Sequence, residues 1–120
     1  MLEGGQAEKP VILVLSDADG QVENEVLAGI EEEGVPARVE RPRSGGIATD
    51  LARDAAARSS LSVGVGIDAD GRVCVHHDKL PTSPPGLFST GRADPVTARV
   101  LGHNAARIVV GIPLRTARLS

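Results

Sequence analysis

Three consecutive glutamates, Glu31 to Glu33, are the strongest candidates for a functional site in this sequence. They end an apolar-faced segment over residues 22–33 that reads as a helix, with Gly34 and Pro36 as its stop signals. A helix carboxyl end carries partial negative charge, so each anion there costs roughly 0.3–1 kcal/mol, and adjacent glutamates also repel one another. One interpretation is a tolerated, solvated surface turn. The other is that a partner's cation or a shared metal ion meets this end.

Helical periodicity gives each of these side chains a direction. With Val26 at the centre of the buried face and about 100° per residue, Glu32 lies about 120° from that centre. Glu33 lies near the apolar side. We therefore expect Glu32 to be free to reach outward from the helix.

Other residues with catalytic or metal-binding chemistry do not converge. Cys74 and His76 alternate along one expected strand and share a face, but His77 points the other way and His103 is far along the chain. A zinc site needs three or four ligands, and a nucleophilic cysteine needs an activating neighbour. The interpretation is a buried thiol beside histidines, and no catalytic residue is predicted.

The loop that follows the first expected strand fits neither a nucleotide nor a calcium site. It reads Ser-Asp-Ala-Asp-Gly-Gln over residues 16–21 and lacks the glycines of a dinucleotide loop. Asp17 and Asp19 would repel a phosphate, and the later ligands of a calcium loop are missing. The loop is interpreted as a strand-to-helix turn with caps.

The elements that must position these residues alternate along the chain. Apolar runs and turn signals predict strands over 11–15, 37–40, 62–67 and 72–76, an edge strand over 86–89, and helices over 22–33, 49–59 and from Pro95 to about 110. The Asp-Gly turn before residue 72 reverses the chain, so the fourth strand runs antiparallel to the third. This order predicts an α/β fold with a mixed sheet of four to five strands and helices on both faces. We expect one domain over 10–115, with tails at 1–9 and 116–120.

Composition excludes several classes of function. The chain has 120 residues and a net charge of −3, with one Phe and no Trp or Tyr. It has no Lys/Arg run for nucleic acid, and no apolar run near the roughly 20 residues that a membrane span requires. A single cysteine excludes an internal disulfide, which favours a cytoplasmic location. With these other classes of function excluded, we expect a protein that works by binding another protein.

Several separate motifs resemble those of one family. They are residues 25–36 (EVLAGIEEEGVP), 56–67 (AARSSLSVGVGI), 79–81 (KLP), 102–107 (GHNAAR) and 111–113 (GIP). In this order, across about residues 10–115, they resemble the small (beta) subunit of diol/glycerol dehydratase reactivase, also called dehydratase-reactivating factor.

The resemblance implies a fold and a role. The family fold is a three-layer α/β/α sandwich with one antiparallel strand, like that of the dehydratase medium subunit. The reactivase is a chaperone that uses ATP to release damaged cobalamin from adenosylcobalamin-dependent diol or glycerol dehydratase. The resemblance implies a large ATPase subunit as the partner in a heterotetramer, and subunit exchange with the dehydratase. A bacterial microcompartment is a second location to consider.

The resemblance also assigns site residues. It implies that Glu32 reaches a divalent cation, such as Mg²⁺, at the interface with the large subunit, with Glu31 and Glu33 beside it. The isolated chain is then expected to be non-catalytic and to hold no cofactor, neither ATP nor cobalamin. Two alternatives stay open: a medium subunit of the dehydratase, whose chains are longer, and a stand-alone enzyme, which the missing catalytic constellation disfavours.

Overall fold

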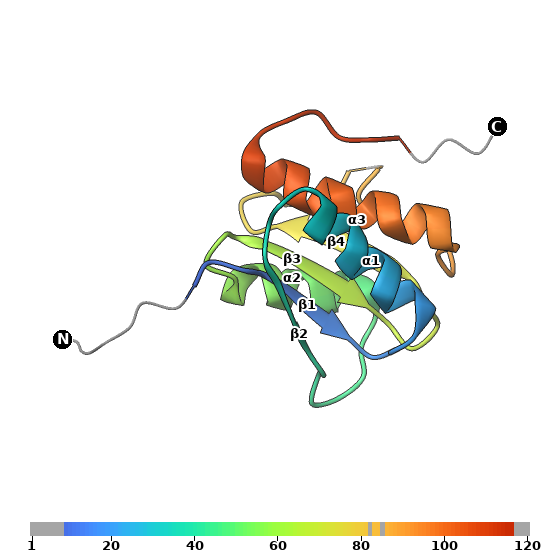
Figure 1. Cartoon of the computed structure of the whole chain (residues 1–120). Helices are drawn as coiled ribbons and strands as arrows, with labels where there is room; N and C mark the ends of the chain where they lie inside the picture. The colour runs from blue at the N-terminus through green and yellow to red at the C-terminus, as the bar shows by residue number, and fades with distance from the viewer. Residues whose placement is uncertain (1–8, 82, 85, 117–120) are drawn as a thin grey trace.

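A mixed four-stranded sheet organises the computed structural model, which describes residues 9–81, 83–84 and 86–116 (Figure 1). The strands are β1 (Ile12–Ser16), β2 (Ala37–Glu40), β3 (Val63–Ile67) and β4 (Val73–His77), in the sheet order β2-β1-β3-β4. β1 pairs in parallel with β2 and with β3, whereas β4 runs antiparallel to β3. The predicted mixed sheet with one antiparallel strand is confirmed.

Helices cover both faces of this sheet. α1 (Gln21–Glu32) and α3 (Pro95–Val110) lie side by side on one face, and α2 (Ala48–Arg58) lies on the other (Figure 1). The arrangement is the expected three-layer α/β/α sandwich.

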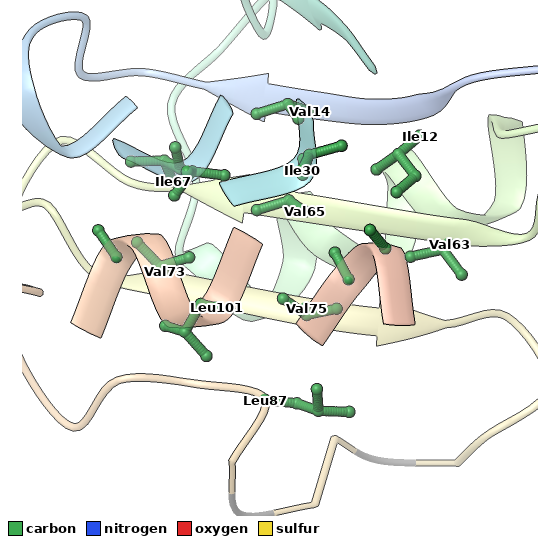
Figure 2. Packing of buried hydrophobic residues seen from close by; sticks show 14 of the residues in the cluster. Ile12, Val14, Ile30, Val63, Val65, Ile67, Val73, Val75, Leu87 and Leu101 are labelled. Atoms are coloured by element: carbon green, nitrogen blue, oxygen red, sulfur yellow. The ribbon is translucent and has the colours of Figure 1, made fainter. Parts of the chain in front are cut away.

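Side chains on the two faces of β1 pack into two separate hydrophobic cores, because successive side chains of a strand point to opposite faces of the sheet. Ile12 and Val14 point into the larger core, under α1 and α3, while Leu13 and Leu15 pack against α2. Figure 2 shows the larger core, which is built almost entirely from aliphatic side chains. Its labelled members are Ile12, Val14, Ile30, Val63, Val65, Ile67, Val73, Val75, Leu87 and Leu101.

Two glycines bring α2 against the sheet. A Cβ placed on Gly64 would lie 2.5 Å from the Cβ of Ala55, and one placed on Gly66 would lie 2.5 Å from the backbone nitrogen of Ala52. Both positions therefore require glycine, because the helix backbone occupies the space of a side chain.

Local chemistry sets the ends of the helices. The Asp94 carboxylate accepts a hydrogen bond of 2.7 Å from the backbone N–H of Thr97, and Gly111 ends α3 with a left-handed φ of 78°. α1 ends one residue earlier than expected, with Glu33 as its C-cap and Gly34 beyond it at φ 80°. The predicted cap in the 16–21 loop is wrong, because Gly20 is the N-cap and contributes no side chain.

The expected edge strand over 86–89 is reduced to a single bridge between Cys74 and Phe88. Two backbone hydrogen bonds, from Val75 to Leu87 and from Ser89 to Val73, hold this segment beside β4. The sheet therefore has four strands and a short bridged edge.

Two sequence expectations concern the ends of the chain and the membrane. Residues 1–8 and 117–120 of the expected tails lie outside the described residues, and the domain boundaries stay a prediction. Among the described helices, none is long and apolar enough to cross a bilayer.

Candidate functional site

Two helical glycines place the glutamates of α1 beside the middle of α3. A Cβ on Gly29 would lie 2.8 Å from the backbone nitrogen of His103, and one on Gly102 would lie 2.9 Å from the carbonyl carbon of Val26. With hydrogen in place of a side chain at both positions, the two helix backbones come into contact. The carboxyl end of α1 therefore lies directly against α3.

The crossing brings Glu32 onto two basic side chains, Arg99 and His103. The Nε of Arg99 donates a hydrogen bond of 3.2 Å to Glu32 Oε1, and its Nη2 pairs with Oε2. The Nε2 of His103 lies 2.8 Å from Oε1. Hydrogen bonds and charge from Arg99 hold the pKa of Glu32 below its ordinary value, with His103 adding a smaller contribution in the same direction.

Glu33 is held more deeply in the same cluster. Its Oε2 accepts a hydrogen bond of 2.8 Å from the Nε of Arg107 and lies 2.7 Å from the Nδ1 of His103. The Glu33 side chain is only 13% exposed, compared with 45% for Glu32. Hydrogen bonds from Arg107 and then His103 lower the pKa of Glu33.

His103 joins the two glutamates, because each of its ring nitrogens faces a carboxylate. Only the doubly protonated ring can donate to both at once. Arg99 extends the cluster further through an ion pair of 3.0 Å between its Nη1 and Glu25. Three carboxylates and three basic side chains thus alternate in an ion-pair cluster of Glu25, Arg99, Glu32, His103, Glu33 and Arg107, which we call the α1–α3 cluster.

This geometry revises the electrostatic argument from sequence. Glu32 is half-exposed but not free, since Arg99 and His103 already contact it. The repulsion among the glutamates is offset by cations from α3. Glu31 differs, because it is exposed and no ion pair joins it to the part of the chain that the structure describes.

The second candidate group lies at β4. Cys74 Sγ and His76 Nδ1 each lie 3.4 Å from the hydroxyl of Ser83, which donates a hydrogen bond of 2.7 Å to the Val75 carbonyl. Burial raises the pKa of the Cys74 thiol and lowers that of His76. The thiol is therefore protonated near neutral pH, which does not suit a nucleophile.

Arg41, in the loop after β2, contacts the end of β1 and the first turn of α1. Arg41 donates a hydrogen bond of 3.2 Å to the Ser16 carbonyl and pairs with both carboxylate oxygens of Glu23. Within the described ranges, no group of three or more His, Cys, Asp or Glu side chains is arranged to hold a metal ion.

Comparison with known proteins places this architecture in a family. The model of the dehydratase medium subunit family matches residues 9–115. The chain belongs to this family. The expected likeness in fold to the dehydratase medium subunit is thereby confirmed.

Curated relatives narrow the comparison within the family. The chain is 39% identical over 110 residues to the propanediol dehydratase-reactivating factor small subunit of Citrobacter freundii, covering 88% of this chain and 90% of that one. It is 37% identical over 114 residues to the diol dehydratase-reactivating factor small subunit of Klebsiella michiganensis, covering 95% and 90%. It is 42% identical over 105 residues to a propanediol counterpart from Salmonella typhimurium, covering 88% of each chain.

Solved structures agree with these relatives. A chain from a diol dehydratase-reactivating factor complexed with ADP and Mg²⁺ superposes with a TM-score of 0.79 at 39% identity, over 91% of this chain and all of that one. A glycerol dehydratase reactivase chain gives a TM-score of 0.82 at 32% identity, over 92% and 100%. The resemblance drawn from the motifs is confirmed, and it is favoured over a dehydratase's own medium subunit.

Sequence reasoning found the glutamates but missed their partners on α3. Arg99, His103 and Arg107 are spaced four residues apart, which aligns them along one helix face. That basic stripe is a signal that could have been read beside the acidic end of α1. His103 is too distant in sequence to join Cys74 and His76 in a zinc site, but its spacing from Arg99 and Arg107 is informative.

Proposed function

We propose that this chain is the small subunit of a reactivating factor for an adenosylcobalamin-dependent diol or glycerol dehydratase. The observation that carries the proposal is identity of 37–42% to reactivating-factor small subunits over about nine-tenths of both chains. A small subunit implies a larger partner. We assign to that partner the ATPase activity, in a heterotetramer located in the cytoplasm or a microcompartment, with this chain as a non-catalytic component.

The fold supports a mechanism of subunit exchange. The chain has the architecture of the dehydratase medium subunit family, so its surface can take the place that a medium subunit occupies in a dehydratase. In this mechanism the small subunit leaves the large subunit, which then contacts the dehydratase and releases the damaged cobalamin with ATP. The α/β/α sandwich contributes a rigid surface, and the chemistry belongs to the partner.

The carboxyl end of α1 is the proposed contact with the large subunit, through Glu31, Glu32 and Glu33. The Glu32 carboxylate can supply one ligand to a divalent cation. A carboxylate offers about four acceptor positions, and within the described residues Arg99 and His103 use two on Oε1 and one on Oε2. Mg²⁺ commonly takes one or two protein carboxylates and keeps several waters, so the large subunit and water would complete its shell. Bound there, the cation would supply charge that joins carboxylates of both subunits.

The function is tested by reconstitution with the cognate large subunit. The purified pair is added with ATP and fresh cobalamin to a dehydratase inactivated during turnover, and recovery of diol dehydration is measured. We expect recovery only when both subunits and ATP are present. If this chain instead completes an active dehydratase with that enzyme's large and small subunits, it is a medium subunit and the proposal fails.

The metal assignment is tested by a four-point cycle. The dissociation constant of the complex is measured for wild type and Glu32→Ala, each in Mg²⁺ and in chelator. Because both changes remove the same bond, their effects should not add. Glu31→Gln, on the exposed neighbour without a described ion pair, is the matched control and should weaken the complex less. Full additivity would refute the link between Glu32 and the metal.

A further inference from the structure

Glu32 and Glu33 are adjacent in sequence but differ in how firmly they are held. Glu33 is 13% exposed and is held by Arg107 and by His103. Glu32 is 45% exposed, and its strongest partner is Arg99, whose own side chain is 41% exposed. Solvent reaches both side chains of this pair, so water can replace either partner, whereas the partners of Glu33 are more enclosed. Of the two carboxylates, Glu32 is the one that can change partner without opening the core.

Arg99 is placed to release Glu32 and remain paired. Its guanidinium uses Nε and Nη2 for Glu32 and keeps Nη1 for Glu25, at 3.0 Å. These are different edges of one planar group. A small rotation can therefore break the contact with Glu32 while the bond to Glu25 persists. The three side chains line one open pocket together with His103, so the guanidinium has space beside it.

A divalent cation and Arg99 cannot both engage the Glu32 carboxylate at full strength. Both are positive and would lie within a few ångströms of one another, where like charges repel. Mg²⁺ also demands near-octahedral geometry and retains water molecules, which need the space that the guanidinium occupies. His103 presents a smaller obstacle, because it stays anchored to Glu33 through its other nitrogen.

We propose that Arg99 is the exchangeable counter-ion of Glu32: it occupies this carboxylate in the free subunit and yields it to a divalent cation at the subunit interface, moving onto Glu25. The metal role of Glu32 is part of the proposed function, and the inference rests on it. Arg99 is then a positioning residue that keeps the free subunit from collecting metal and keeps Glu32 ordered for assembly.

The free chain provides the first test, with Mn²⁺ as the probe. Paramagnetic broadening of amide signals around Glu32 is followed by NMR as Mn²⁺ is added to wild type, Arg99→Gln, Arg99→Lys and Arg107→Gln. Arg107→Gln is the matched control, because Arg107 lies on the same helix face but contacts Glu33. We expect Arg99→Gln alone to lower the Mn²⁺ concentration for half-maximal broadening, by roughly 5- to 100-fold, which is the usual range of coupling between two sites.

One further variant makes the result decisive. The double variant Arg99→Gln with Glu32→Gln should lose the gained broadening, which assigns it to this carboxylate. Equal broadening in wild type and Arg99→Gln, or an equal gain in Arg107→Gln, would overturn the inference. Because the probe acts on the free chain, this outcome is independent of whether the chain binds a large subunit.

The complex provides the second test. With the large subunit, Arg99→Gln should reduce the Mg²⁺ concentration for half-maximal assembly, while Arg107→Gln leaves it unchanged. If no complex forms for wild type, the proposed function fails even where the Mn²⁺ result holds. If the complex forms but Arg99→Gln requires more Mg²⁺ than wild type, Arg99 assists the metal rather than competing with it, and the inference is overturned.

Discussion

The backbone contact between α1 and α3 predicts the effect of a single methyl group. At Gly102, an added Cβ would lie 2.9 Å from the carbonyl carbon of Val26 and would overlap its carbonyl oxygen. Atoms in ordinary contact lie about 3.5–4.0 Å apart, and the carbonyl oxygen is closer still, so Gly102→Ala must push α1 and α3 apart by roughly 1 Å or more. The obstacle is backbone, and no rotamer change can relieve it.

Two opposing effects decide the size of the change. In an unobstructed helix, alanine in place of glycine would stabilise the protein by about 0.5–1 kcal/mol. Inserting a carbon into a packed site costs about 1–3 kcal/mol, and the cost lies at the upper end or above it when backbone must move. We therefore expect Gly102→Ala to lower the free energy of unfolding by roughly 1–3 kcal/mol, which reduces the folded-to-unfolded ratio about 5- to 150-fold.

Urea denaturation followed by circular dichroism measures this difference. Gly91→Ala is the control, because Gly91 lies in the loop before α3 with nothing within 4 Å of the added carbon. It should unfold at the urea concentration of wild type. A midpoint for Gly102→Ala at or above that of wild type would mean that α1 and α3 are not in backbone contact. The placement of Glu32 against Arg99 would then lose its physical basis.

Three further outcomes follow from other contacts. Burial raises the pKa of Glu23, but hydrogen bonds from Arg41 and Ser16 lower it by more, so its net pKa is below the ordinary value and it stabilises the fold less as pH falls. In Arg41→Met, burial is left to dominate, so urea midpoints between about pH 2 and 6 should show this loss on acidification reduced or reversed; an unchanged profile would contradict the pairing. The Cys74 thiol, whose pKa burial raises, should react with a disulfide reagent only on unfolding, and rapid native labelling would contradict its burial. Glu33→Gln should lower the urea midpoint while Glu31→Gln leaves it unchanged, and equal effects would contradict the deeper position of Glu33.

Local signals made the elements predictable. Asp94, Pro95 and Gly111 mark the ends of α3 through capping and turn chemistry that depends only on neighbouring residues. β1 and β3 were evident as apolar runs, and the Asp-Gly turn specified the antiparallel β4. The segment over 86–89 is predicted as a strand but forms a single bridge, from Phe88 to Cys74.

Long-range contacts limited what could be predicted of the site. The outward direction assigned to Glu32 agrees with its 45% exposure, since periodicity alone determines which face of a helix a residue occupies. Its partners Arg99 and His103 lie 67 and 71 residues further along the chain. Their approach depends on how α1 and α3 cross, which Gly29 and Gly102 decide jointly. No pattern within either helix alone specifies that pairing.

The α1–α3 cluster changes the reason for expecting an interface at the three glutamates. From sequence, the reason was uncompensated repulsion at a helix carboxyl end. In the folded chain, His103 and Arg107 satisfy Glu33, so repulsion no longer requires an external cation there. An external cation has a place only at Glu31, which has no described ion pair, and at Glu32. Arg99 and His103 already order the Glu32 carboxylate in the free chain, before Arg99 yields it to an interface cation, so part of the cost of fixing that side chain is borne by folding rather than by assembly.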